Sequence, residues 1–423
     1  MTLVKSASST TPQEAAATVT PSGAPAGPDR AEETLDQRGT LTVSGAHFAH
    51  DLYSSFLGPL IPAVQDKLGV SLFIASLMVP AQQMPSVVQP FVGAWADRTS
   101  KRWFVVAAPA VAALAVSSIG LAPHVAFILL LLIVSGLASA AFHAPSIALV
   151  GEYGGSQTGR AMSYFMFGGE ASRAIGPLII TAAIAWFTLE GSFVVAVFGV
   201  AASVILYFTV DTTKSDSDAA GRRQLNIAIR PLLRARARWL TGIFGFSLMI
   251  SAFNAPFAFF LFKYLVVEGR GEWFAGLSLS LYFAAGGFGG LLWGPLSDRI
   301  GRRNVLYGTL GISPLFVYLY LMFEGVSGLG LVVLAVAGIF SMASRPIMLA
   351  LAQEILPESR AQMSGLMLAF GFVTMSLITM AFGAISDEVG VDTALWYVPA
   401  FGFLAIPFIA LLPRRGEPLP MPE

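Results

Sequence analysis

Three ionisable residues lie close together in an otherwise apolar stretch near the beginning of the chain. His47, His50 and Asp51 follow one another at spacings of three and one, so a helix would present all three on one face. A histidine beside a carboxylate can take up and release a proton near physiological pH. We therefore expect Asp51 and His50 to act in proton coupling and His47 to contact substrate. The alternative is a solvated polar face at the mouth of a cavity.

A second apolar stretch contains an arginine, Arg345. A charge in the middle of a membrane span costs at least ~2.5–3.5 kcal/mol, which makes such a residue a candidate for function. A guanidinium is always charged and binds carboxylate or phosphonate oxygens through two parallel hydrogen bonds. We expect Arg345 to bind an anion; the alternative is an internal salt bridge to Asp51 or Glu170. His143 and Asn254, each midway along an apolar stretch, are further expected substrate contacts.

Glu170 and Arg173 lie one helical turn apart in another apolar stretch. The simpler interpretation is an ion pair between the two residues. Alternatively, protonation of Glu170 would release Arg173 toward an anionic ligand. Under that hypothesis Glu170 takes part in proton coupling and Arg173 contacts the substrate.

The composition predicts that membrane-spanning helices position these residues. The chain has 423 residues, of which 55% are hydrophobic and 12% charged, and its mean hydropathy is +0.71. Soluble domains carry roughly 25% charged residues. The interval between Arg102 and Glu152 contains no Asp, Glu, Lys or Arg, and it has room for two spans of ~20 residues. Long continuous apolar runs favour helices over a barrel. The predicted fold class is an all-α polytopic membrane protein.

The apolar runs predict twelve spans in two six-helix bundles. They cover about residues 40–64, 71–96, 103–122, 125–151, 159–187, 191–210, 239–264, 274–297, 303–323, 328–353, 361–386 and 392–413. The longest polar interruption falls between the sixth and seventh spans. We therefore predict a disordered tail at 1–38, bundles at 39–210 and 239–413, a cytoplasmic linker at 211–238 and a C-terminal tail at 414–423.

The distribution of basic residues predicts the orientation. Lys and Arg collect on the cytoplasmic side of membrane proteins. If both termini are inside, the inside segments hold 20 of the 25 Lys and Arg residues and the outside loops hold three. We expect a multi-pass protein of the inner (plasma) membrane with both termini in the cytoplasm.

A motif recurs in the two predicted bundles. Gly93-Ala-Trp-Ala-Asp97-Arg98-Thr-Ser-Lys101-Arg102 is followed later by Gly294-Pro-Leu-Ser-Asp298-Arg299-Ile-Gly-Arg302-Arg303. The two aspartates are 201 positions apart, and the segments of Arg160 and Arg360 are related by 200. This nearly constant offset predicts two homologous halves.

Two halves of six spans, with this motif after spans two and eight, resemble the major facilitator superfamily of secondary transporters over roughly 40–413. The runs His47-Phe-Ala-His-Asp51, Gln89-Pro-Phe-Val-Gly-Ala-Trp-Ala-Asp97, Phe142-His143, Gly168-Gly169 and Gly176-Pro177 look like the fosmidomycin-resistance-type efflux transporters. Glu170, Arg173 and Ala144-Pro145-Ser146 depart from that pattern. The resemblance implies alternating access to a central cavity between the halves, lined by spans one, four, seven and ten.

In family terms, the charged residues at the predicted cytoplasmic helix ends form a gating latch. Their salt bridges, partly solvated, are individually weak, which suits a gate that must open. The set comprises Asp97, Arg98, Arg102, Glu152 and Arg160 in the first half and Asp298, Arg299, Arg302, Glu354 and Arg360 in the second.

The leading hypothesis is a secondary active transporter that couples protons to efflux of a small organic anion or drug-like compound, an antiport typical of drug resistance. A divalent-metal exporter is an alternative, although Arg345 and Arg173 would repel a cation. Its ligands would be His47, His50, Asp51, His143 and Glu170. A membrane sensor or scaffold that lost transport is another. We expect a monomer whose partners are a small-molecule substrate, protons and the lipid bilayer, without enzymatic activity, cofactor, bound metal or nucleic acid.

Overall fold

The computed structural model describes residues 35–98, 100–154, 158–210, 233–323, 327–356, 360–418 and 420. Within these ranges the regular structure is helical and contains no strand. The predicted N-terminal tail and linker lie almost entirely outside the described residues. The predicted domain boundaries therefore stay predictions.

The helices of the first half alternate between long uninterrupted rods and broken segments. In chain order they are α1 (Gln37–Asp51), η1 (Ser54–Phe56), α2 (Leu57–Leu68), α3 (Leu72–Ser76), α4 (Met78–Gln83), η2 (Met84–Val88), α5 (Gln89–Arg98), α6 (Lys101–Ser117), η3 (Ser118–Leu121), α7 (Val125–Gly154), α8 (Thr158–Gly191), η5 (Ser192–Val195) and α9 (Ala196–Thr209). Thr188, with φ 63°, interrupts the regular geometry of α8 close to the predicted end of the fifth span.

The second half contains longer continuous helices. They are α12 (Ala237–Val267), α13 (Glu272–Ile300), α14 (Arg302–Phe323), α15 (Ser327–Ser341), α16 (Ser344–Ile355), α17 (Arg360–Val389), α18 (Val391–Leu404) and α19 (Ile406–Ile409). Gly301, with φ 95°, and Gly390, with φ 86°, make the tight connections before α14 and α18.

The described helices are consistent with the predicted spans. Nine candidate segments are long and apolar enough to cross a membrane, and one of them, 161–209, covers the predicted fifth and sixth spans together. The predicted first and second spans are not among the nine because the chain forms several short helices there. The structure is therefore an all-helical polytopic membrane protein.

Two short breaks in the α-helical hydrogen-bond pattern lie next to candidate residues. One follows Asp51, the last residue of α1, where Leu52 and Tyr53 keep helical backbone angles. The other lies between Ser341 and Ser344, where Ala343 keeps helical angles, so both spans continue through these turns. Arg345 therefore lies in the first turn of α16. In contrast, α7 continues through Pro145, although a proline inside a helix removes a backbone hydrogen bond.

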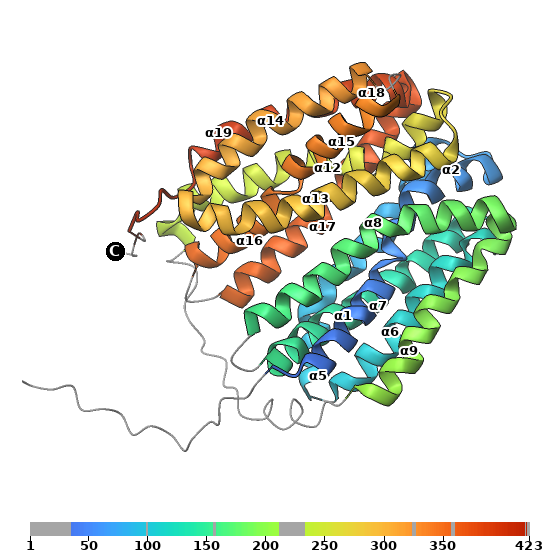
Figure 1. The fold of residues 1–423 in the computed structure, drawn as a ribbon, viewed down its shortest axis with the longest axis horizontal. Helices are drawn as coiled ribbons and strands as arrows, with labels where there is room; N and C mark the ends of the chain where they lie inside the picture. The colour runs from blue at the N-terminus through green and yellow to red at the C-terminus, as the bar shows by residue number, and fades with distance from the viewer. Residues whose placement is uncertain are drawn as a thin grey trace, which may run out of the picture.

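The helices assemble into two groups (Figure 1). The blue-to-green helices α1–α9 form one group and the yellow-to-red helices α12–α19 form the other. Helices α8 and α13 lie side by side along the boundary, α17 packs against α3 and α4, and α12 packs against α2. Of the helices that carry candidate residues, α8 lies at this boundary, α1 and α7 pack against α8, and α16 packs against α13.

Apolar side chains lie both inside the molecule and on its surface. Phe56, Phe257 and Phe260 belong to a buried cluster that includes residues of both helix groups. Phe208 and Trp186 remain 79% and 71% exposed. A bilayer is the solvent in which such an apolar exterior is stable, because soluble proteins rarely expose large apolar patches.

Candidate functional site

Asp51 is held between two histidines from different helices. Its Oδ2 lies 3.2 Å from Nε2 of His47, one turn earlier on α1, and its Oδ1 lies 3.3 Å from Nε2 of His143 on α7. We call these three residues the His–Asp–His cluster. The sequence placed Asp51 and His143 on separate spans, and the structure brings them into contact.

Backbone carbonyl groups fix both imidazole rings. Nδ1 of His47 lies 2.7 Å from the carbonyl oxygen of Phe165 on α8. The imidazole ring of His47 stacks on the phenyl ring of Phe165 at a centroid distance of 4.0 Å. Nδ1 of His143 lies 2.9 Å from the carbonyl oxygen of Ser139, one turn earlier on α7. A carbonyl oxygen can only accept, so Nδ1 of His47 donates to Phe165. Nδ1 of His143 also lies 3.2 Å from the hydroxyl oxygen of Ser139, which can donate to it or accept from it. Sequence reasoning missed both acceptors, because every residue carries a carbonyl group and its direction depends on the fold.

His50 lies in a different environment from His47 and His143. Its ring is buried and stacks on Phe142 at a centroid distance of 4.6 Å. No hydrogen-bond partner for its Nδ1 occurs in the described part of the chain. The predicted face of three residues is therefore divided, with His47 and Asp51 in contact and His50 turned toward the neighbouring aromatic ring.

A glycine on α8 makes the close approach to the cluster possible. A Cβ atom added to Gly169 would lie 2.7 Å from Cε1 of His47 and 3.3 Å from Oδ2 of Asp51. The first distance is shorter than any normal carbon–carbon contact. Gly169 thus allows α8 to pack directly against the cluster.

One turn further along α8, Glu170 and Arg173 form the predicted ion pair. Nη2 of Arg173 lies 2.5 Å from Oε1 of Glu170, and both side chains are about a third exposed, at 27% and 32%. Glu170 also borders the second half, because a Cβ atom added to Gly287 of α13 would lie 3.4 Å from Cβ of Glu170. Arg173 lies within electrostatic range of Asp51 and His143 as well.

Arg345 approaches this pair from the other half. Its side chain is exposed, and it lies within electrostatic range of Arg173, Glu170 and Tyr282. Glu170 is bonded to Arg173, and among the described residues the structure shows no ion pair for Arg345. The alternative of a salt bridge from Arg345 to Asp51 or Glu170 is therefore not the arrangement seen here.

Asn254 lies beside Tyr282, a residue that sequence reasoning did not single out. The hydroxyl of Tyr282 donates to Oδ1 of Asn254 at 3.5 Å, and Nδ2 of Asn254 donates to the carbonyl oxygen of Ser341 at 3.5 Å. Ser341 is the last residue before the break that precedes Arg345. These contacts connect α12 and α13 to the tenth span.

Among the described residues, the His–Asp–His cluster is also a group that could hold a metal ion. One donor atom from each of the three residues lies within 4.8 Å of the others. Two imidazoles and a carboxylate suit a divalent transition metal. The neighbouring guanidinium of Arg173 makes the surroundings less favourable for a cation.

The predicted latch is partly described. Nη2 of Arg302 lies 2.6 Å from Oε1 of Glu354, whereas Arg102 donates to the carbonyl oxygen of Tyr207. Lys101, which the prediction omitted, lies 3.4 Å from Glu152. Because Lys101 and Arg302 are 201 positions apart, the offset could have identified Lys101 as the equivalent residue.

Of the remaining predicted latch residues, Arg299 makes one contact in the described part of the chain. The carbonyl oxygen of Arg299 accepts from Arg415. The side chains of Asp97, Arg98, Arg160, Asp298 and Arg360 lie outside the described residues. The end of the molecule that carries Lys101, Arg102, Glu152, Arg302 and Glu354 is termed the basic end below.

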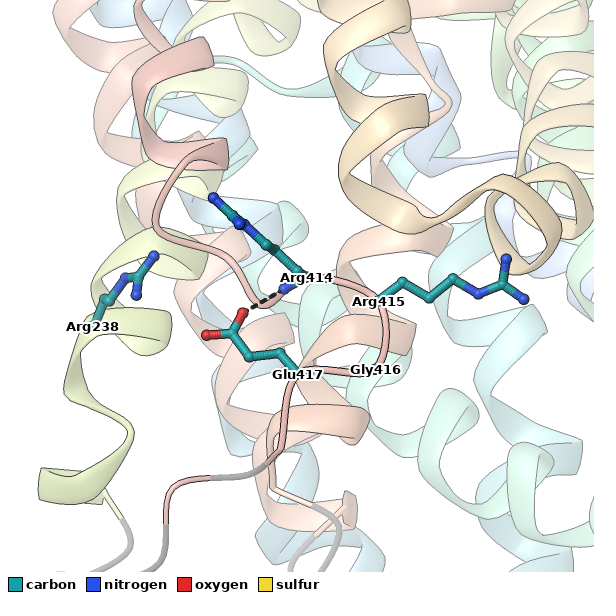
Figure 2. Close-up of a pocket in the computed structure, with 5 residues that line it drawn as sticks. All are labelled: Arg238, Arg414, Arg415, Gly416 and Glu417. Atoms are coloured by element: carbon teal, nitrogen blue, oxygen red, sulfur yellow. Dashed lines mark hydrogen bonds between the residues drawn. The ribbon is translucent and has the colours of Figure 1, made fainter.

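A surface pocket at the basic end is separate from this site (Figure 2). It is lined by Arg238, Arg414, Arg415, Gly416 and Glu417. The carboxylate of Glu417 accepts from the backbone amide of Arg414, and the guanidinium of Arg415 extends away from that contact. The pocket therefore already contains an acidic group of its own.

Comparisons with known proteins identify the family. A family model described as Major Facilitator Superfamily matches residues 43–273 and 271–422. The chain is 25% identical over 402 residues to the "Fosmidomycin resistance protein" of Escherichia coli (strain K12), covering 91% of this chain and 95% of that protein. It is 25% identical over 396 residues to the "Uncharacterized MFS-type transporter YfnC" of Bacillus subtilis (strain 168), covering 88% and 95%.

Solved structures have the same fold. A bacterial homolog of the human lysosomal transporter Spinster, inward-facing and unoccupied, aligns with a TM-score of 0.70 at 14% identity, covering 88% of this chain and 95% of that one. A D-xylose-proton symporter aligns with a TM-score of 0.68 at 15% identity, covering 90% and 98%. With the family model matching both halves, the chain belongs to the Major Facilitator Superfamily.

Proposed function

We propose that this transporter couples protons to the export of a small organic anion by alternating access. The observation that carries the proposal is the position of Arg345, exposed and without an ion-pair partner among the described residues, beside the Glu170–Arg173 pair. Glu170 is bonded to Arg173, so the guanidinium group of Arg345 remains to hold an anion. A guanidinium binds carboxylate or phosphonate oxygens through two hydrogen bonds.

The His–Asp–His cluster supports coupling to protons. Its members are two imidazole groups and a carboxylate, and imidazole is the side-chain group whose ordinary pKa lies near the physiological range. The cluster lies within electrostatic range of Arg173, which in turn is bonded to Glu170. A change in its protonation therefore alters the field at the arginines that would hold the anion.

The contacts between the two halves support alternating access. Away from the basic end, Asp387 of α17 accepts from the backbone amides of Leu72 and Phe73 at 2.7 and 2.8 Å, and Lys263 lies 3.8 Å from Asp66. We infer that the basic end faces the cytoplasm, with both termini, and that the protein is closed toward the outside here.

The direction of transport is inferred from a relative. The Escherichia coli protein is named for resistance to a compound, and removal of a toxic compound from the cell is a direct route to resistance. Export also requires that the substrate be captured from the cytoplasmic side. A state that is closed toward the outside is suited to that capture.

A divalent metal exporter is the second candidate, favoured by the three donor atoms within 4.8 Å. Arg173 and Arg345 argue against it, since a cation beside two guanidinium groups is repelled. The hypothesis of a membrane sensor or scaffold that does not transport is also less well supported. Ionisable residues within membrane spans are costly and commonly mark substrate or ion pathways, which a purely structural role does not require.

Transport into inside-out membrane vesicles tests the proposal. Vesicles with an acidic lumen receive organic anions, organic cations, neutral compounds of matched size, or Zn²⁺, and accumulation is measured. We expect one or more anions to accumulate with the wild type and not with Arg345→Gln. Arg238→Gln, which removes an exposed arginine at the basic end, should accumulate them normally. Accumulation of Zn²⁺ or of cations alone would contradict an anion exporter.

A further inference from the structure

We propose that Arg236 is a positioning residue of the transport site. Its guanidinium group holds the basic end of α16, the helix whose first turn carries Arg345, against the C-terminal segment of the chain. The inference rests on the anion site proposed above at Arg345 and adds the contact that fixes the helix bearing it. Arg236 immediately precedes α12 and is remote from Arg345 in the sequence.

Arg236 is a buried cation that bonds two separate parts of the chain. Only 1% of its surface is exposed. A guanidinium is always charged, and burial of a charge is costly unless the group is hydrogen-bonded. Nη1 donates to the carbonyl oxygen of Ile355 at 2.8 Å, and Nε donates to that of Pro420 at 3.2 Å. The side chain therefore joins the first of these segments to the second.

The acceptor Ile355 is the last residue of α16. The last four carbonyl groups of an α-helix have no partner within the helix, and they form the negative end of its dipole. A cation bonded to one of them is therefore favourably placed. Arg302 holds the same end of α16 through Glu354, at 2.6 Å. Two arginines thus fix the basic end of this helix.

The position of this end affects the site because α16 is a short rod. It has 12 residues and is about 18 Å long at 1.5 Å per residue. Its other end follows the break in the helical hydrogen-bond pattern, where the carbonyl oxygen of Ser341 accepts from the side chain of Asn254 at 3.5 Å. Insertion of a side chain into the helical ladder is a common cause of bending. A tilt of the rod about this point displaces Arg345 relative to Glu170 of the other half.

The C-terminal segment that receives Arg236 is itself anchored to neighbouring helices. Leu412 is fully buried, and its carbonyl oxygen accepts from Arg303 of α14 at 3.2 Å. Arg415, whose side chain is extended in Figure 2, donates to the carbonyl oxygen of Arg299 in the last turn of α13 at 2.5 Å. Arg236 therefore bonds α16 to a segment that is held on α13 and α14.

Distances between spin labels test the inference without any substrate. Because the chain contains no cysteine, Arg345→Cys and Met322→Cys introduce two unique labels, one at the site and one at an exposed position on α14. Pulsed electron paramagnetic resonance then gives the distribution of distances between them. Arg236→Gln, added to this labelled background, removes the buried cation.

Arg238→Gln is the matched control. Arg238 is exposed and donates to the carbonyl oxygen of Ala410 at 3.3 Å. Among the described residues it makes no hydrogen bond to α16. The two variants thus remove the same charge two positions apart, and only one of them removes a contact with the helix that carries Arg345.

We expect the distance distribution to broaden or shift in Arg236→Gln and to stay unchanged in Arg238→Gln. Without the labels, backbone amides of α16 should exchange hydrogen about tenfold faster in Arg236→Gln, the factor expected when a hydrogen bond to a charged group is lost. Amides of α6, in the first half, should exchange at the wild-type rate. An unchanged distribution would overturn the inference. So would faster exchange throughout the protein, since Arg236 would then support the whole fold instead of α16.

Binding measurements connect this inference to the proposed function. In the protein without labels, Arg236→Gln should raise the dissociation constant of a transported anion severalfold, and Arg238→Gln should leave it unchanged. Wild-type affinity in Arg236→Gln would overturn the positioning role. If the wild type binds no anion, the proposed function fails, whereas the label distances still show whether Arg236 sets the position of residue 345. The two proposals therefore fail separately.

Discussion

The carboxylate of Asp387 accepts a hydrogen bond from the backbone amide of Leu72, at 2.7 Å, across the boundary between the two halves. Its second oxygen accepts from the next amide at 2.8 Å. Nearby, a Cβ atom added to Gly383 would lie 2.6 Å from the hydroxyl oxygen of Ser76, so α17 and the beginning of the second span are in close contact. A charged side chain thus bonds two amides that α3 cannot satisfy internally.

Replacement of Asp387 by Asn should favour opening at this end. The amide group of Asn is neutral and has one acceptor oxygen, so it cannot reproduce two charge-assisted hydrogen bonds. Hydrogen bonds to a charged group contribute about 1.5–3 kcal/mol, and about 1.4 kcal/mol corresponds to a tenfold change in population. We expect Asp387→Asn to increase the population open at this end about tenfold.

Cysteine labelling measures this change directly, because the chain contains no cysteine. Thr181, which is buried and lies close to Gly276 of the other half, is replaced by Cys. A membrane-impermeant maleimide should label Thr181→Cys faster in the Asp387→Asn background. Leu121→Cys, at an exposed position, should label at the same rate in both backgrounds. Equal rates at position 181 would show that Asp387 does not stabilise the closed end.

Most of the helical framework could be predicted from the sequence, but the breaks near the site could not. The third to ninth spans follow long apolar runs, and helices α6 to α14 cover them. The break after Asp51 has no helix-breaking residue at that point. In contrast, the break before Arg345 lies next to Pro346, whereas the equivalent Pro145 leaves α7 continuous. Tertiary packing decides between these outcomes, and a local pattern cannot report it.

The sequence indicated which residues belong to the candidate site, but it did not indicate which of them contact one another. Helical spacing placed His47, His50 and Asp51 on one face, yet only His47 contacts the carboxylate. The second contact comes from His143, almost a hundred positions away. The Glu170–Arg173 pair was predictable because its spacing of three is local. Contacts between helices depend on helix rotation and on Gly169, and neither follows from spacing.

Replacement of Arg345 by Lys should weaken anion binding although the charge is kept. A lysine ammonium is a point charge and cannot form the two parallel hydrogen bonds of a guanidinium. Loss of one charged hydrogen bond, about 1.5–3 kcal/mol, raises the dissociation constant tenfold or more. Equilibrium binding of a transported anion to purified protein measures the effect. Arg238→Lys serves as the matched control, and wild-type affinity in Arg345→Lys would argue against an anion site at this residue.

Replacement of Asp51 by Asn should uncouple transport from the proton gradient. The side chains are nearly isosteric, so the contacts with His47 and His143 can persist, but an amide group cannot take up or release a proton as a carboxyl group does. We expect gradient-driven accumulation to disappear, while exchange of labelled for unlabelled substrate without a gradient continues. The variant should be expressed at wild-type levels. Gradient dependence equal to that of the wild type would remove Asp51 from the coupling mechanism.

Replacement of Gly169 by Ala tests whether the cluster needs its close packing. The added Cβ would lie 2.7 Å from Cε1 of His47, so the ring must move away from the carbonyl oxygen of Phe165 and from Asp51. Overpacking of this kind costs about 1–3 kcal/mol. We expect a lower thermal unfolding temperature and a loss of gradient-driven transport.

A second glycine provides the matched control for this substitution. Gly45 lies on α1, two positions before His47, and a Cβ atom added there would meet nothing within 4 Å. Alanine also has the higher helix propensity, by about 1 kcal/mol. Gly45→Ala should therefore retain transport and unfold at the same or a higher temperature. If Gly169→Ala also transports normally, α8 has room to adjust, and the ring position of His47 does not control coupling.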